Sequence, residues 1–136
     1  MKHLYLPIVI VQSARAGYAF LLLLMGLAFY FGFFEPTDSM TTLFSMAQAW
    51  AVILWAIYVL GYVAASVLAW QRKRLAFFIF IGALTIDLGL WVYSSFNALY
   101  QASIGGYAAL IDMIFNLIDL SIVAGLYFLW RSGELR

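Results

Sequence analysis

Four apolar segments, each long enough to cross a lipid bilayer, dominate this sequence. They cover residues 16–34, 46–70, 75–97 and 107–130. A helix rises about 1.5 Å per residue, so about 20 apolar residues cross the roughly 30 Å hydrocarbon core of a membrane. With 67% hydrophobic and only 10% charged residues, the chain has too little polar surface for a water-soluble globule. The sequence therefore predicts an integral membrane protein with four transmembrane helices.

These segments predict an all-α four-helix bundle that forms one membrane domain, residues 1–136. Short connections make successive helices antiparallel, which gives an up-down-up-down arrangement. No linker, low-complexity tract or repeat divides the chain. Residues 1–15 have a basic start and an apolar middle. We interpret them either as an interfacial segment or as an extension of the first helix, with Pro7 in or near its first turn.

The basic residues predict the orientation of the bundle. All seven lie before the first span, between the second and third, or after the fourth: Lys2, Arg15, Arg72, Lys73, Arg74, Arg131 and Arg136. The other two connections contain no Lys or Arg. Because cytoplasmic loops carry an excess of Lys and Arg, both termini are expected in the cytoplasm (N-in/C-in). We expect the membrane to be the inner (plasma) membrane of a bacterium.

Polar residues inside two of the spans predict a functional site. Asp112, Asn116 and Asp119 fall within about a 60° arc of the fourth helix. By helical rise, Asp119 and Asp87 each lie roughly 18 Å from the end of their span, near the midplane. Ser94 continues the face of Asp87 outward. We expect a pathway lined by Asp112, Asn116 and Ser94 that leads from the outer side to Asp87 and Asp119.

The charge of these two aspartates is the main constraint on their role. An ionised carboxylate at the bilayer centre costs at least about 2.5–3.5 kcal/mol. Helices two to four contain no Lys, Arg or His at this depth, and we expect Arg15 near the inner end of the first helix. Asp87 and Asp119 are therefore expected to titrate as a unit, holding a proton or sharing a cation. The alternatives are a hydrogen bond that joins two helices and a contact with another subunit.

Small residues predict where the helices pack most closely. Gly61, Ala65 and Ala69 recur at every fourth position in the second span, and Gly82 and Gly89 lie seven residues apart in the third. Strips of small residues let membrane helices approach closely. The sequence is compatible with an intramolecular contact or with a seam between two copies.

Several classes of function lack their usual residues. The net charge of +1 gives no argument for nucleic acid binding. Cysteine is absent and the one histidine is His3, so thiolate and haem ligands are missing. No phosphate-binding loop, dinucleotide fingerprint, zinc motif or nucleophile elbow occurs. We therefore expect no enzymatic activity, no catalytic residues, no cofactor and no metal site.

Two function hypotheses from different classes remain. In the preferred one, the protein is a non-catalytic accessory subunit or assembly partner of a larger membrane complex, and it retains the buried titrating pair. In the other, it is a homo-oligomeric transporter or channel, linked to a proton or cation through Asp87 and Asp119. Against transport, no Pro or Gly break lies beside Asp119, and only Gly89 lies near Asp87. The expected partners are membrane lipids and either other subunits or copies of the chain.

Overall fold

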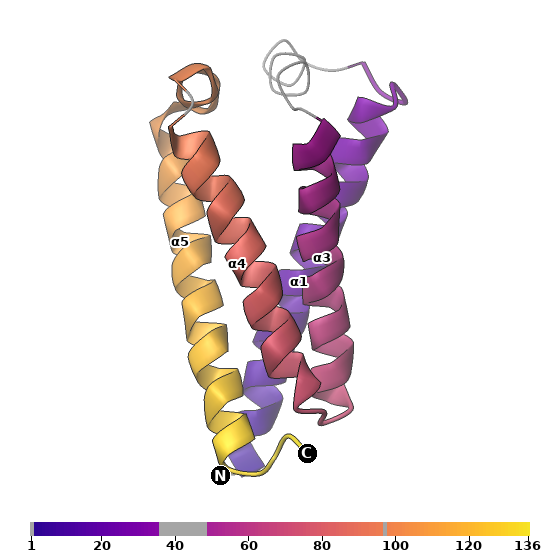
Figure 1. The fold of residues 1–136 in the computed structure, drawn as a ribbon, viewed down its shortest axis with the longest axis vertical. Helices are drawn as coiled ribbons and strands as arrows, with labels where there is room; N and C mark the ends of the chain where they lie inside the picture. Colours follow the sequence, from indigo (N-terminus) through magenta and orange to yellow (C-terminus); the bar gives the residue numbers. More distant parts are fainter. Residues whose placement is uncertain (1, 36–48, 97) are drawn as a thin grey trace.

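Four long helices make up the computed structural model, which describes residues 2–35, 49–96 and 98–136. They are α1 (Lys2–Tyr30), α3 (Ala49–Trp70), α4 (Leu75–Ser95) and α5 (Ala98–Arg131). Each helix packs against the next along the chain, and α5 also contacts α1 (Figure 1). Each contains a segment that is long and apolar enough to span a membrane. The prediction of an all-helical, four-span bundle of sequential neighbours is confirmed.

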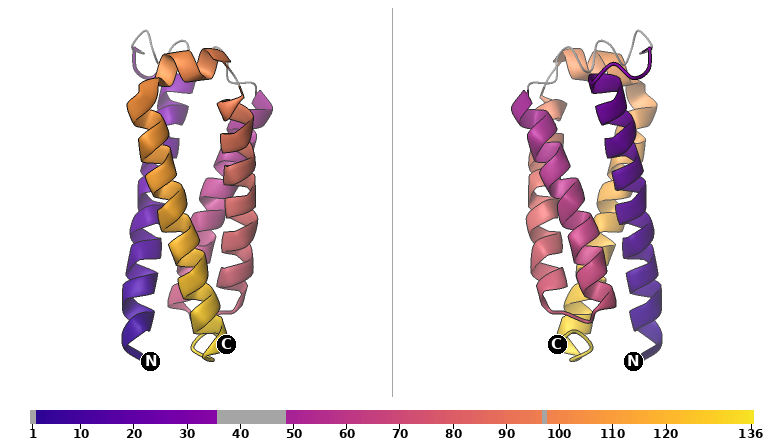
Figure 2. Two further views of the ribbon diagram at one scale, coloured as in Figure 1. Left: turned by 90° about the vertical axis from the view of Figure 1, so that its left-hand side faces the viewer. Right: turned by 90° about the vertical axis from the view of Figure 1, so that its right-hand side faces the viewer.

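The first helix follows the second interpretation of residues 1–15, as an extension of the span, and the last helix is longer than its predicted span. Helix α1 begins at Lys2, so residues 2–15 continue the first span as helix. Helix α5 begins at Ala98 and includes Gly105 and Gly106, which were expected to precede it. Its first turns run across one end of the bundle before the helix descends (Figure 2). Glycine pairs are common places for such a change of direction.

Helices α3 and α4 meet along small side chains. A Cβ atom added to Gly61 would lie 2.9 Å from the Cβ of Ala83, so the two backbones approach closely there. Ala65 and Ala69, on the same strip of α3, are fully buried. Gly82 and Gly89 lie on exposed faces of α4, with no atom within 4 Å of an added Cβ. Within the bundle, Ala83 therefore makes the close approach, one residue away from the predicted strip.

The end of the bundle that carries both termini is tied together by the last residues of the chain (Figure 1). The backbone N–H of Arg136 donates to the carbonyl of Arg72 at 2.6 Å. Arg72 also forms an ion pair with Glu134 at 2.8 Å, and Leu135 is buried. Nearby, the hydroxyl of Tyr5 donates to the carbonyl of Ala69 at 2.8 Å. The sequence did not predict this closure.

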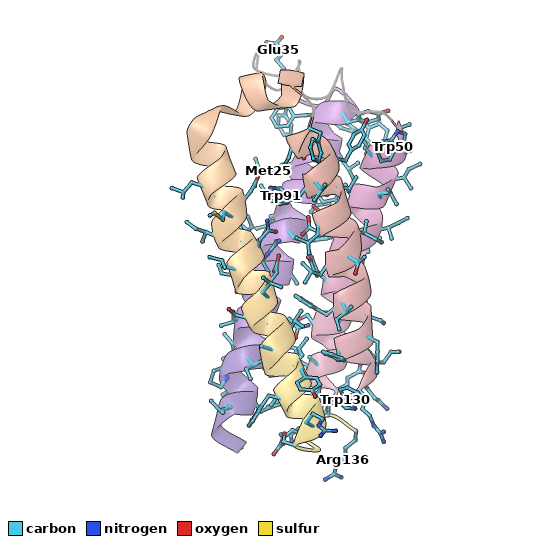
Figure 3. All side chains as sticks on the ribbon, turned by 60° about the vertical axis from the view of Figure 1, so that its left-hand side comes forward. Met25, Glu35, Trp50, Trp91, Trp130 and Arg136 are labelled. Atoms are coloured by element: carbon cyan, nitrogen blue, oxygen red, sulfur yellow. The ribbon has the colours of Figure 1, made fainter. Side chains whose placement is uncertain are left out.

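Toward the opposite end, α3 and α4 diverge (Figure 1). Large rings bridge them there, because the centroids of Trp50 and Tyr93 lie 5.1 Å apart. In Figure 3, Glu35 and Trp50 mark this end, and Trp130 and Arg136 mark the end with the termini. At the end with the termini, the rings of Phe77 and Trp130 also stack, at 5.3 Å, so aromatic side chains pack both ends of the bundle.

Candidate functional site

A buried ion cluster lies at the centre of the bundle, where α1, α4 and α5 bring one arginine and two aspartates together. Arg15 on α1 donates from Nε to Oδ1 of Asp119 at 2.9 Å, and from Nη2 to Oδ2 at 2.8 Å. This two-pronged geometry is the strongest form of an arginine–carboxylate contact. The Asp119 side chain is fully buried and that of Arg15 is 10% exposed. Asp119 is therefore directly neutralised inside the protein.

Asp87 on α4 contacts the same guanidinium at a longer distance than Asp119 does. Its Oδ2 lies 3.5 Å from Arg15 Nη2. The same oxygen accepts a 2.9 Å hydrogen bond from the hydroxyl of Tyr62 on α3. Tyr58, one turn before Tyr62, also interacts with Asp87. The second carboxylate is thus held mainly by phenol groups, while Asp119 takes both short bonds from Arg15.

Aromatic rings enclose the arginine. Its Cζ lies 5.2 Å from the ring centroid of Tyr62 and 5.0 Å from that of Phe115. Phe115 stacks on Tyr18 at 5.0 Å. A guanidinium near ring faces gains cation–π attraction, which is largest where water is excluded. These contacts hold the planar Arg15 group between α3 and α5, so its two short bonds reach Asp119.

The position of Arg15 corrects one expectation from the sequence. Arg15 was expected near the inner end of the first helix, which left both carboxylates without a cation. Because α1 begins at Lys2, Arg15 lies 13 residues (15 − 2), or about 20 Å, along the helix. It therefore reaches the depth of both aspartates. The usable signal is the run of buried α1 positions at spacings of three and four, which begins well before residue 16: Tyr5, Val9, Gln12, Ala16, Ala19 and Leu23.

The predicted pathway residues are only partly brought together. Asp112 and Asn116 are half-buried on α5, on the face that leads to Asp119. Asp112 also interacts electrostatically with Asp87. Ser94 does not join the cluster, because its hydroxyl donates to the carbonyl of Trp91 in its own helix at 2.9 Å. The polar stripe therefore follows α5 rather than both helices.

Sequence reasoning missed Tyr62 at the site and placed Arg15 at a different depth. Tyr62 belongs to a series on one face of α3 with a spacing of four: Tyr58, Tyr62, Ser66 and Trp70. That periodicity is visible in the sequence, although each member by itself reads as an ordinary membrane residue. Gln12 on α1 is a further polar side chain that is fully buried. A glutamine in a membrane helix is the clearest signal that was available for it.

The charges of the cluster do not balance. If all three groups were ionised, one guanidinium would face two carboxylates and leave a net charge of −1 (+1 − 2). Five charged or titratable side chains surround Asp87: Arg15, Tyr58, Tyr62, Asp112 and Asp119. Among the described residues, no group of three or more His, Cys, Asp or Glu is placed to hold a metal ion. The arrangement can take up one positive charge.

No protein-family model, curated protein or solved structure matches this chain.

Proposed function

We propose that this four-span membrane protein is a small, homo-oligomeric, proton-linked transporter or channel in which Asp87 is the group that exchanges the proton. The observation that supports this is the unequal sharing of Arg15 by two carboxylates. Asp119 receives two short bonds, whereas the nearest oxygen of Asp87 is 3.5 Å from the guanidinium. In a low-dielectric interior, the unmatched negative charge requires a counter-charge.

A proton fits this position better than a metal cation does. A metal ion on Asp87 would lie beside the positive guanidinium, and like charges repel strongly where water is scarce. A proton neutralises Asp87 and leaves the Arg15–Asp119 pair unchanged. Tyr62 remains able to donate to the carboxyl oxygen of Asp87 in either state.

The polar face of α5 supports access from the end opposite the termini. Asp112 and Asn116 lie on the route from that end to Asp119, and both are half-buried. On the side of the termini, buried apolar residues such as Phe80 and Leu126 pack below the cluster. The distribution of Lys and Arg supports placing the termini in the cytoplasm of a bacterial cell. In that orientation, Asp87 would exchange protons with the outer side through the α5 stripe.

Counting protonated carboxyls tests this proposal. Infrared difference spectroscopy on the purified protein at neutral pH is expected to show one protonated carboxyl in the wild type. Charge balance predicts none in Asp87→Asn or in Asp119→Asn, because Arg15 then faces a single carboxylate. It predicts two in Arg15→Gln. The matched control is Asp112→Asn, which should leave the count at one. A wild type with every carboxyl ionised would contradict the proposal.

Proton flux tests transport itself. Protein reconstituted in vesicles that contain a pH-sensitive dye should carry protons when a membrane potential is applied. Asp87→Asn should abolish the flux, because the exchanging group is lost, whereas Thr85→Val, which alters an exposed hydroxyl two residues away, should not. If one carboxyl is protonated as expected but no proton flux is measured, the cluster binds a proton and the transport function is contradicted.

A second proposal is the non-catalytic subunit of a larger membrane complex. It is supported by an apolar groove of about 430 Å³ between α1 and α5, which none of the residues that the structure describes fills. Its lining residues are Pro7, Ile8, Val11, Ile114, Leu117, Ile118, Ser121 and Ile122. The mass and composition of the particle after mild detergent extraction separate the two proposals. Co-purifying subunits favour the complex, and copies of this chain alone favour the transporter.

A further inference from the structure

The turn between α3 and α4 carries three consecutive cations, Arg72, Lys73 and Arg74, and Arg136 adds a fourth. Residues 132–136, which we call the tail, leave α5 and fold back to this turn (Figure 1). The backbone N–H of Arg136 donates to the carbonyl of Arg72 at 2.6 Å, and that of Arg74 donates to the carbonyl of Arg136 at 3.1 Å. The fold therefore brings together four cations from two distant segments of the chain.

Arg72 holds the tail in place. Its guanidinium forms an ion pair with Glu134 at 2.8 Å, and its Cζ lies 4.3 Å from the centroid of the Tyr5 ring. The backbone of Arg72 has a φ of 57°, a left-handed conformation that costs free energy in a residue with a Cβ and persists where surrounding contacts fix it. Leu135, within the tail, is buried. The charge of Arg72 is thus used inside the protein.

The other three cations have no counter-charge within the part of the chain that the structure describes. Lys73, Arg74 and Arg136 are exposed, and none of their side chains forms an ion pair or hydrogen bond with a described residue. The described acids other than Glu134 lie within the spans or at the end that Glu35 marks in Figure 3. Counting side chains, the turn and the tail carry +3 (+4 − 1). Because like charges repel, this arrangement favours a bound anion.

These cations lie at the depth of lipid headgroups. The apolar span of α3 ends at Trp70 and that of α4 begins at Leu75, and both side chains are half-exposed. Tryptophan is enriched where membrane helices meet the headgroup layer. The basic turn lies directly outside the two spans, so lipid phosphates are the nearest abundant anions. This depth is the same whichever side of the membrane the termini occupy.

Arginine side chains suit a phosphate as the anion. A guanidinium presents its N–H donors in a planar fork that matches two phosphate oxygens. Clusters of Lys and Arg beside a membrane span bind anionic lipids. We infer that Lys73, Arg74 and Arg136 form a headgroup site for an anionic phospholipid, and that this site is complete only when the tail is docked. The inference is independent of the proposed proton-linked function.

Lipid binding to single-residue variants tests this headgroup site. The purified protein in detergent is titrated with phosphatidylglycerol or with phosphatidylcholine of the same acyl chains, and native mass spectrometry counts the bound lipids. The wild type should bind phosphatidylglycerol more tightly. Arg74→Gln and Arg136→Gln should each weaken phosphatidylglycerol binding about fivefold, because one basic residue contributes about 1 kcal/mol. The matched control is Arg131→Gln, which removes an exposed cation of α5 outside the turn and the tail and should change the affinity less than about twofold.

A variant that keeps every cation separates a built site from general surface charge. Leu135→Gly removes the buried side chain of the tail, so phosphatidylglycerol binding should weaken about as much as in Arg136→Gln. Circular dichroism checks that each variant keeps the helix content of the wild type. Equal affinities of the wild type for the two lipids would overturn the inference. An unchanged affinity in Leu135→Gly, or equal losses in Arg131→Gln and Arg136→Gln, would overturn it as well, because attraction to surface charge alone would then explain the binding.

Discussion

At the scale of single residues, Arg15 decides how the buried charges are arranged. A planar guanidinium holds its five N–H donors in a fixed fork, so one carboxylate can take two parallel bonds from it. Asp119 accepts both short bonds from Arg15, and Asp87 accepts its short hydrogen bond from the Tyr62 hydroxyl. Buried ion pairs add little net stability, because desolvation offsets most of the attraction, but removing one partner strands the other. The cluster is therefore sensitive to single changes and tolerant of paired ones.

Replacing Arg15 alone tests this sensitivity. Arg15→Leu should lower the free energy of unfolding by about 3–5 kcal/mol at neutral pH, because Asp119 loses its partner and must take up a proton to stay buried. The loss should shrink as the pH falls, since that proton uptake then costs less free energy. The double variant Arg15→Leu with Asp119→Leu should recover much of the stability. Thermal unfolding in detergent measures all three proteins. Equal stability of Arg15→Leu and the wild type would show that the pair is not formed.

At the scale of helices, the seam between α3 and α4 depends on a one-residue difference in register. One residue turns a helix by about 100°, so Ala83 faces Gly61 while Gly82 points away from the seam. Spacing alone suggested Gly82 and Gly89, since both helices carry small residues at regular intervals. The rotation of α4 about its own axis is set by its larger buried side chains, among them Phe77, Phe80 and Leu84. Small residues allow two helices to approach closely, but they do not determine which face of α4 lies against α3.

Leucine substitutions at Gly61 and Gly82 distinguish the packed face of α3 from the exposed face of α4. Gly61→Leu should destabilise the bundle by about 1–3 kcal/mol, because an added Cβ already lies 2.9 Å from the Cβ of Ala83. Gly82→Leu, the matched control on α4, should leave thermal stability close to that of the wild type, since nothing lies within 4 Å of its added Cβ. If Gly82→Leu instead reduces the particle size in detergent, the exposed strip of α4 is a seam between copies.

At the scale of the whole molecule, the two ends of the bundle are built differently. The chain end, the α3–α4 turn and the start of α1 are joined by backbone and side-chain hydrogen bonds where both termini lie. At the opposite end, α3 and α4 diverge and contact through Trp50 and Tyr93 (Figure 1). This asymmetry matches the distribution of charge, because the described Lys and Arg residues other than Arg15 belong to the closed end.

Single cysteines test the orientation of these ends, since the natural chain contains none. Cysteine at the exposed position Glu35 should react with a membrane-impermeant reagent added outside intact cells. Cysteine at the exposed position Lys73 should react only after the cells are opened. The reverse labelling pattern would place the termini outside.

The sequence by itself determined the spans and the polar positions. Four apolar segments of sufficient length predict four membrane helices whatever their packing. Helical rise places Asp87 and Asp119 at similar depths, and both contact the guanidinium of Arg15. The small strip at Gly61, Ala65 and Ala69 follows from a spacing of four, and these side chains do lie on the inner side of α3. All of these properties are local, because they depend on distance along one helix.

The tertiary structure alone decided which side chains meet. Arg15 reaches both carboxylates because α1 begins at Lys2, and no glycine or charge cluster in the sequence marks that start. Tyr62 joins the site because α3 is rotated so that this position faces the interior. The axial rotation and crossing of helices result from the packing of many side chains at once. Spacing within one helix carries no information about that result, so the ion cluster could not be assembled from the sequence.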